Sequence, residues 1–196
     1  MPPARYDQRT ALVVVDVQND FADPGGSLFV RGAGAVVDAV NAEAQGARRA
    51  GALVVYTQDW HPADTPHFAK DGGVWPVHCV AGTWGAAFHP GLVVDGPVVH
   101  KGTGGEDGYS AFTMRDPVSG EARSTGMGEL LRAHGVERVV VVGLATDYCV
   151  VASAHDARAA GFATTVVRAA VAAVDLAAGD GDRALAELAA TGVAVV

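Results

Sequence analysis

A cysteine at the junction of a predicted strand and a predicted helix is the clearest candidate nucleophile of this chain. The apolar run at residues 139–142 ends at Gly143, and Cys149 follows where a helix should begin. A thiol at a helix start lies near unpaired backbone N–H groups and the positive end of the helix dipole. Both effects favour the thiolate, which attacks carbonyl carbon. A buried structural cysteine is the alternative, and this stretch does not decide between the two.

Three further side chains with useful chemistry also follow predicted strands. Asp16, Asp59 and Lys101 each lie just past the carboxyl end of a different predicted strand. Because the carboxyl ends of parallel strands meet at one rim of a sheet, we expect these groups to lie near Cys149. A buried carboxylate can act as a base, and an ammonium can lower the pKa of a thiol. Asp16, Lys101 and Cys149 are therefore predicted to be catalytic, although each alone could be a strand-end cap, a surface charge or a structural thiol.

A second group of residues could bind a metal ion. Asp59 and His61 are two residues apart, so in extended backbone they project to the same side. His67 and His78 follow in the same irregular segment. Histidines and a carboxylate with room for water suit Zn²⁺, or non-haem Fe²⁺ or Mn²⁺. Scattered loop histidines are the alternative, and to that class we assign His89, His100, His134 and His155.

Short buried strands alternate with helices along the chain. Apolar runs predict strands at 11–15, 52–56, 97–100, 139–142, 163–167 and 193–196, and helical periodicity predicts helices at 34–50, 129–134, 148–160 and 183–190. Residues 60–96 are predicted to be irregular, and 102–128 a glycine-rich loop. This alternation predicts an α/β fold with one domain, 1–196, as a three-layer α/β/α sandwich around a six-stranded, mostly parallel sheet.

The composition excludes several classes of partner. The 196 residues are 49% hydrophobic and 18% charged with a net charge of −8, which is typical of a globular chain without a basic patch. We therefore expect no binding to nucleic acid and none to membranes. The N-terminus resembles no export signal, so we expect a cytoplasmic protein whose Cys79 and Cys149 are reduced. A homo-oligomer is possible, but no surface pattern identifies one.

Five motifs, in order, resemble the nicotinamidase group of the isochorismatase-like cysteine hydrolase family. They are residues 16–21 (DVQNDF), 59–61 (DWH), 75–80 (WPVHCV), 101–102 (KG) and 143–150 (GLATDYCV). No single motif is decisive, but five in order over most of the chain are specific. The resemblance implies an isochorismatase-like hydrolase fold.

The resemblance also implies a reaction and the residues that perform it. Nicotinamide and water would give nicotinate and ammonia, a step of NAD salvage, and pyrazinamide would be hydrolysed as well. Asp16 would be the general base, Lys101 the group that orients and polarises, and Cys149 the nucleophile. The backbone N–H groups of Ala145, which follows a cis peptide in the family, and of Cys149 would form the oxyanion hole.

One divalent metal ion is implied by the same resemblance. Asp59, His61 and His67 would bind it, with His78 as the fourth ligand found in some members. Zinc is the first expectation, with Fe²⁺ or Mn²⁺ as alternatives. The ion is expected to bind the pyridine nitrogen rather than the scissile bond.

The substrate pocket is implied less completely. Phe21 and Trp75 correspond to rings that sandwich the pyridine, and Tyr109 is expected to contact the substrate. Tyr148 departs from relatives that carry His at this position, so it is assigned no role, and neither are the contacts of the loop 102–128.

Two other functions stay open on these residues. The chain could be a family member that hydrolyses another small carboxamide, or a non-catalytic metal- or ligand-binding member. The presence of Asp16, Lys101 and Cys149 together argues against a binding protein. A redox protein is disfavoured because the chain has no Cys-x-x-Cys motif.

Overall fold

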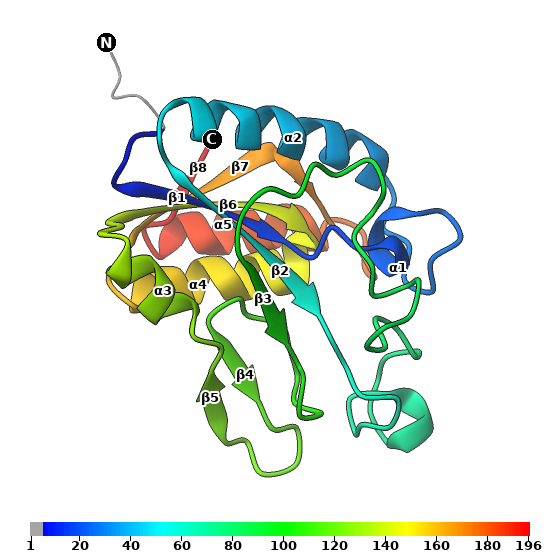
Figure 1. The fold of residues 1–196 in the computed structure, drawn as a ribbon. Coiled ribbons are helices and arrows are strands. Elements are labelled where there is room, and N and C mark those ends of the chain that lie inside the picture. The colour runs from blue at the N-terminus through cyan, green and yellow to red at the C-terminus, as the bar shows by residue number, and fades with distance from the viewer. Residues whose placement is uncertain (1–5) are drawn as a thin grey trace.

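A parallel sheet forms the centre of the fold in the computed structural model, which describes residues 6–196 (Figure 1). Within these residues the sheet has six strands: β1 Thr10–Val15, β2 Leu53–Asp59, β3 Val98–Lys101, β6 Arg138–Leu144, β7 Ala163–Ala172 and β8 Ala194–Val195. Their spatial order is β3-β2-β1-β6-β7-β8, and every neighbouring pair is parallel. The six predicted strands and the predicted sheet are therefore confirmed.

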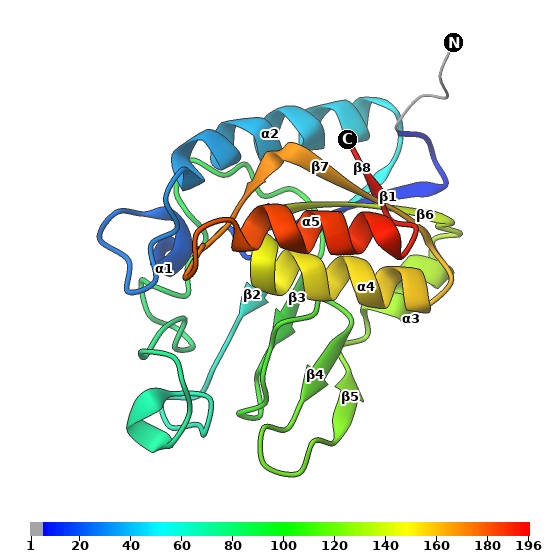
Figure 2. The same cartoon turned by 180° about the vertical axis from the view of Figure 1, so that it is seen from behind.

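Helices cover both faces of this sheet. Helix α2 (Ala33–Arg49) lies on one face, and α3 (Met127–Ala133), α4 (Val151–Ala159) and α5 (Asp180–Ala190) lie on the other (Figures 1 and 2). A single turn of helix, α1 (Asn19–Ala22), follows β1. The predicted three-layer α/β/α sandwich is confirmed. Among residues 6–196, no helix has the length and hydrophobicity needed to cross a membrane.

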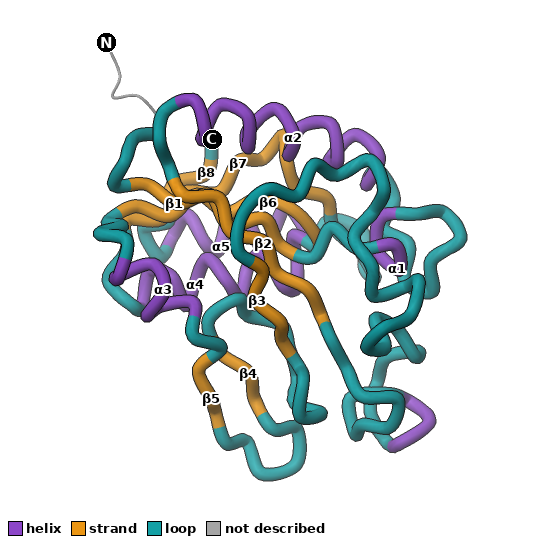
Figure 3. The backbone as a smooth tube through the Cα atoms, in the orientation of Figure 1, coloured by secondary structure: helices purple, strands orange, loops and turns teal. Residues whose placement is uncertain are grey.

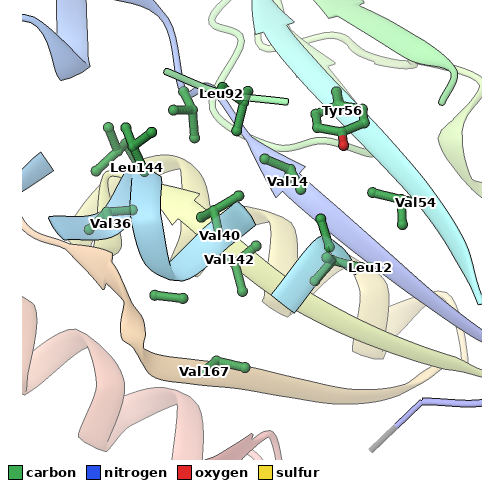
Figure 4. Packing of buried hydrophobic residues seen from close by; sticks show 14 of the residues in the cluster. Leu12, Val14, Val36, Val40, Val54, Tyr56, Leu92, Val142, Leu144 and Val167 are labelled. Atoms are coloured by element: carbon green, nitrogen blue, oxygen red, sulfur yellow. The ribbon is translucent and has the colours of Figure 1, made fainter. Parts of the chain in front are cut away.

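The apolar strand runs are continuous because both faces of the sheet are buried. In β1, Leu12 and Val14 join a cluster with Val36 and Val40 of α2 (Figure 4). The alternate residues Ala11, Val13 and Val15 face the other cluster, which contains residues of α3, α4 and α5. All of these β1 side chains are fully buried. A strand between two helical layers therefore has no polar face, which is why its sequence does not alternate.

The two long segments after β2 and β3 differ from each other. Apart from one 3₁₀ turn, Ala69–Asp71, residues 60–96 are irregular, as predicted (Figure 3). The predicted loop 102–128 instead contains an antiparallel pair, β4 (Thr113–Arg115) and β5 (Ala122–Ser124). Only Met114 of these two strands is buried. Strands this short and this exposed carry no periodic pattern, so the loop prediction was wrong here.

The strands β1 and β6 approach very closely just before the residues expected to do chemistry. Gly143 of β6 has a φ of 113°, and a Cβ added there would lie 2.1 Å from the carbonyl oxygen of Val15. A glycine is thus required both by the left-handed backbone and by the neighbouring strand. Gly135, after α3, has a φ of 67° but open space around it.

These two glycines give a matched test of the close approach. Gly143→Ala is expected to lower the free energy of unfolding by more than ~2 kcal/mol, because backbone strain and a clash with β1 add. Gly135→Ala should cost about 1 kcal/mol, since only the backbone strain applies. Urea unfolding curves measure both, and equal losses would contradict the role given to the β1–β6 approach.

Candidate active site

The site lies at the point where the order of strands in the sheet reverses. The chain leaves β1 toward β2 and leaves β6 toward β7, so the loops that follow these neighbouring strands diverge and open a crevice. Asp16 follows β1, and Cys149 lies in the π-helical turn Thr146–Val150 that follows β6. The donor atoms of Asp16, Asp59 and Cys149 lie within 4.8 Å of one another. The structure thus brings together the side chains predicted to share a rim.

A buried ammonium joins two carboxylates in this crevice. Lys101 Nζ lies 2.7 Å from Asp16 Oδ2 and 2.8 Å from Asp59 Oδ1, and the Lys101 side chain is fully buried. It also donates to the backbone carbonyls of Gly108 and Tyr109. Burial lowers the pKa of Lys101, but the two carboxylates more than offset this and hold it well above its usual value. Lys101 is therefore a charged component of the site and not a surface residue.

Asp16 has the environment of a general base. Its pKa is raised from the ordinary value to about 6: burial is the largest cause, Lys101 lowers the pKa and the charge of Asp59 raises it. The hydroxyl of Thr57 donates to Asp16 Oδ1 at 2.6 Å and also lowers this pKa. Thr57 is a β2 residue that the sequence analysis did not select. A carboxylate with a pKa near 6 is ionised at neutral pH yet basic enough to take a proton.

Cys149 is protonated in its resting state. Burial raises the pKa of its thiol well above the usual value, and Lys101 lowers it only in part. Burial therefore opposes the thiolate that the helix start was expected to favour. The thiol therefore needs a base, and Asp16 is the carboxylate that β1 brings to it.

The histidines of the irregular segment form the predicted metal cluster. Ring nitrogens of His61, His67 and His78 lie within 4.8 Å of one another, and His61 Nε2 is 3.9 Å from Asp59 Oδ2. His78 Nδ1 donates to the carbonyl of Pro76 at 2.7 Å, which leaves Nε2 with a lone pair. The four predicted ligands are therefore adjacent, although they come from positions up to 19 residues apart in the sequence.

The protonation state and the unpartnered atoms of this cluster fit a metal ion. Burial lowers the pKa of His61 to about 4, and burial also lowers the pKa of His78, so both rings are neutral. Neither ring nitrogen of the buried His61 has a hydrogen-bond partner in the described part of the chain. Buried polar atoms without partners are costly unless something binds them. Three imidazoles beside the carboxylate of Asp59 form a donor set suited to a divalent ion such as zinc.

One pocket gives access to both the thiol and the metal cluster. It has an empty volume of about 460 Å³ including its open mouth, and Cys149, Asp59, His67 and His78 contribute to its wall. The rings of Phe21, Trp75, Tyr109 and Tyr148 line it as well, together with Leu28 and Val174. The structure thus places all three predicted substrate-binding rings at the pocket. Leu28 and Val174 lie outside the quoted motifs, and nothing in their spacing identified them.

Tyr148, to which no role was assigned, supports the aromatic wall. Its ring meets Trp75 edge-on at a centroid distance of 4.9 Å and an angle of 83°. Trp75 Nε1 donates to the hydroxyl of Tyr109 at 2.8 Å. These two contacts hold the indole at a fixed angle to the pocket.

Ala145, predicted to supply an oxyanion donor, immediately precedes the π-helical turn Thr146–Val150 that contains Cys149. The Leu144–Ala145 peptide bond is cis, as the resemblance implies. The carbonyl of Ala145 accepts the N–H groups of Tyr148 at 3.2 Å and Val150 at 3.1 Å. Ala145 and Cys149 both line the pocket, and their oxyanion role stays a prediction.

Two polar residues that the sequence analysis did not select anchor the loops around the pocket. Buried Gln18 accepts the N–H of Asp59 and donates to the carbonyls of Asp59 and Ala86, all at 2.8–2.9 Å. The carboxylate of Asp147 accepts the N–H groups of Val174 at 3.0 Å and Asp175 at 2.9 Å. Both residues lie inside quoted motifs, so their presence was visible, but their partners are far away in the sequence.

Two comparisons with known proteins match nearly the whole chain. The family model of the Isochorismatase domain matches residues 10–196. The chain is 35% identical over 210 residues to the nicotinamidase of Escherichia coli (strain K12), covering 98% of this chain and 93% of that protein.

Two solved structures are also similar. The structure of PnC1 from L. infantum in complex with nicotinate has a TM-score of 0.89 and 38% identity, covering 98% of this chain and 95% of that chain. The pyrazinamidase of Pyrococcus horikoshii in complex with zinc has a TM-score of 0.85 and 38% identity, with 96% and 98% covered.

The geometry around Asp16 predicts the pH dependence of catalysis. Since the base must be ionised, kcat/KM should fall about tenfold per pH unit below a pKa of about 6. Thr57→Val removes the hydrogen bond that stabilises the carboxylate of Asp16. The pKa of Asp16 should then rise, and the acidic limb of the pH–rate profile should move to higher pH. Thr10→Val, at the other end of the same sheet, should leave the limb in place. An unchanged limb in Thr57→Val, measured by pH–rate profiles, would contradict the assignment of Asp16.

Proposed function

The chain belongs to the isochorismatase family, and from this membership we propose that it acts as a nicotinamidase. The reaction is the hydrolysis of nicotinamide to nicotinate and ammonia, and pyrazinamide is a second substrate. The observation that carries the proposal is that a buried thiol and a histidine–carboxylate cluster face one pocket lined by aromatic rings. A planar heteroaromatic ring with a carboxamide matches that wall, since it can stack on the rings and present its carbonyl carbon to Cys149.

The first half of the reaction uses the thiol and the carboxylate together. Asp16 removes the proton of Cys149 as the sulfur attacks the carboxamide carbon, and the carbonyl oxygen becomes an oxyanion. The backbone N–H groups of Ala145 and Cys149 stabilise that charge. When the tetrahedral intermediate collapses, the C–N bond breaks, Asp16 returns its proton to nitrogen, and ammonia leaves a thioester.

The second half repeats these steps with water. Asp16 removes a proton from a water molecule, whose oxygen attacks the thioester carbon. Collapse of the second intermediate breaks the C–S bond, Cys149 is protonated again, and nicotinate is released. Lys101 keeps its charge throughout, which holds the Asp16 carboxylate toward the thiol and favours its ionised form.

The metal cluster orients the substrate in this proposal. Asp59, His61, His67 and His78 would hold one divalent ion, and their nitrogen and oxygen donors make zinc the first candidate. When bound, the ion would supply a Lewis acid for the pyridine nitrogen. The zinc complex of the similar pyrazinamidase supports this assignment.

We place the enzyme in the cytoplasm, where a thiol nucleophile stays reduced. Cys79 and Cys149 are both free and buried in the structure. A reducing compartment preserves this state.

An ammonia-release assay with nicotinamide, pyrazinamide and aliphatic amides tests the proposed substrate class. Cys149→Ala should lower kcat for nicotinamide by at least ~10⁴-fold, because the covalent route is lost. Binding of nicotinamide, measured by calorimetry, should persist since the aromatic wall is intact.

Cys79→Ala is the matched control, because this second buried cysteine lies outside the pocket wall, and it should retain most of the activity. Ammonia release by Cys149→Ala at the wild-type rate would refute the mechanism. Turnover of aliphatic amides without turnover of nicotinamide would instead show that the substrate is another carboxamide.

Removal of a ligand should remove the metal. We expect His61→Ala to lose the bound ion on purification, because the cluster keeps too few donors to retain it against a chelator. His155→Ala, an exposed histidine on α4, should keep a full complement. Elemental analysis per chain measures both, and full occupancy in His61→Ala would show that the ligands are misassigned.

A further inference from the structure

One histidine of the metal cluster has a carboxylate behind it. His67 Nδ1 lies 2.5 Å from Asp107 Oδ1. A carboxylate can only accept here, so Nδ1 carries the proton and Nε2 presents its lone pair to the cluster. His78 reaches the same state through a backbone carbonyl, whereas neither ring nitrogen of His61 has a hydrogen-bond partner among the described residues. His67 is thus the ligand whose orientation depends on a distant side chain.

Asp107 is itself fixed by the small antiparallel pair. Its N–H donates to the carbonyl of Arg115 at 2.7 Å, and its carbonyl accepts the N–H of Arg115 at 3.1 Å. Arg115 is the last residue of β4, which pairs with β5. The hairpin missed by the sequence analysis therefore braces the carboxylate that contacts His67.

The two residues after Asp107 reach the other parts of the site. The carbonyl of Gly108 accepts a hydrogen bond from the Lys101 ammonium, and the hydroxyl of Tyr109 accepts one from Trp75 in the pocket wall. A Cβ added to Gly108 would lie 3.0 Å from Asp59 Oδ1, so the backbone runs directly against the ion pair. Residues 107–109 thus contact the metal cluster, the catalytic ammonium and the pocket in succession.

We infer that Asp107 is a positioning residue of the metal centre, which holds the ring of His67 in its ligating orientation and ties the metal site to Lys101 through residues 107–109. The inference rests on the metal site of the proposed function but not on its substrate. Carboxylates behind ligating histidines typically fix the tautomer and raise the basicity of the ring.

Zinc affinity measures this role directly. Asp107→Ala should weaken zinc binding by ~10–100-fold, as measured with the metal-free protein by competition with a chromophoric chelator. Asp107→Asn keeps an acceptor of the same shape, because the amide oxygen can face His67, and its loss should be smaller. At saturating zinc, kcat should recover more than the affinity does, since the nucleophile and the base are unchanged.

Glu106→Gln is the matched control. Glu106 is the neighbouring buried carboxylate, and it accepts the N–H of Gly104. Among residues 6–196 it makes no hydrogen bond or ion pair with a predicted ligand, so zinc affinity should stay at the wild-type value. Circular dichroism confirms that each variant is folded. Wild-type zinc affinity in both folded Asp107 variants would overturn the inference. Weakened zinc binding in a protein that does not hydrolyse nicotinamide would uphold Asp107 and reject only the proposed substrate.

Discussion

The buried ammonium of Lys101 is the interaction on which the rest of the site depends. Burying a lysine is unfavourable unless its charge is paired and its protons are accepted, and here Asp16, Asp59 and two backbone carbonyls meet those needs. The ammonium in turn stabilises the negative charge of each carboxylate, because all three groups are buried away from water. One carboxylate belongs to the proposed catalytic set and the other to the metal cluster, so a single charge network joins the two halves of the chemistry.

Burial raises the pKa of both groups that exchange a proton, but it has opposite effects on their reactivity. Burial raises the pKa of Cys149, which makes the thiol harder to ionise, and it raises the pKa of Asp16, which makes the carboxylate a better base. The site therefore holds a resting thiol beside a carboxylate that burial has made a stronger base. Proton transfer can then accompany attack on the substrate, and the reactive thiolate exists only when there is something to attack.

The sheet explains why such a network can be rigid although much of it lies on loops. Asp16, Asp59 and Lys101 lie at the ends of neighbouring strands that are hydrogen-bonded to one another, and the strands β1 and β2 are also packed on both faces. The irregular segment 60–96 is tied to this frame by Gln18, and the wall after β7 is tied by Asp147. Polar anchors of this kind let loops carry ligands and aromatic rings without regular structure of their own.

Local chemistry determined a large part of this protein in advance. Apolar runs identified all six strands of the sheet, and in β1, β2 and β6 these runs are continuous because a strand buried on both faces must be apolar throughout. Asp16, Asp59 and Lys101 lie at the ends of predicted strands. Their side chains were therefore expected to lie close together, since parallel strands end at one rim of the sheet. Only the tertiary structure decided what depends on distant neighbours. Burial raises the pKa of Cys149, Thr57 reaches Asp16 from another strand, and Asp107 contacts His67, which is 40 residues away in the sequence. The β4–β5 pair that holds Asp107 in place is too short and too exposed to show a hydrophobic pattern in the sequence. Its role depends on the contact between Asp107 and His67, which local sequence does not encode.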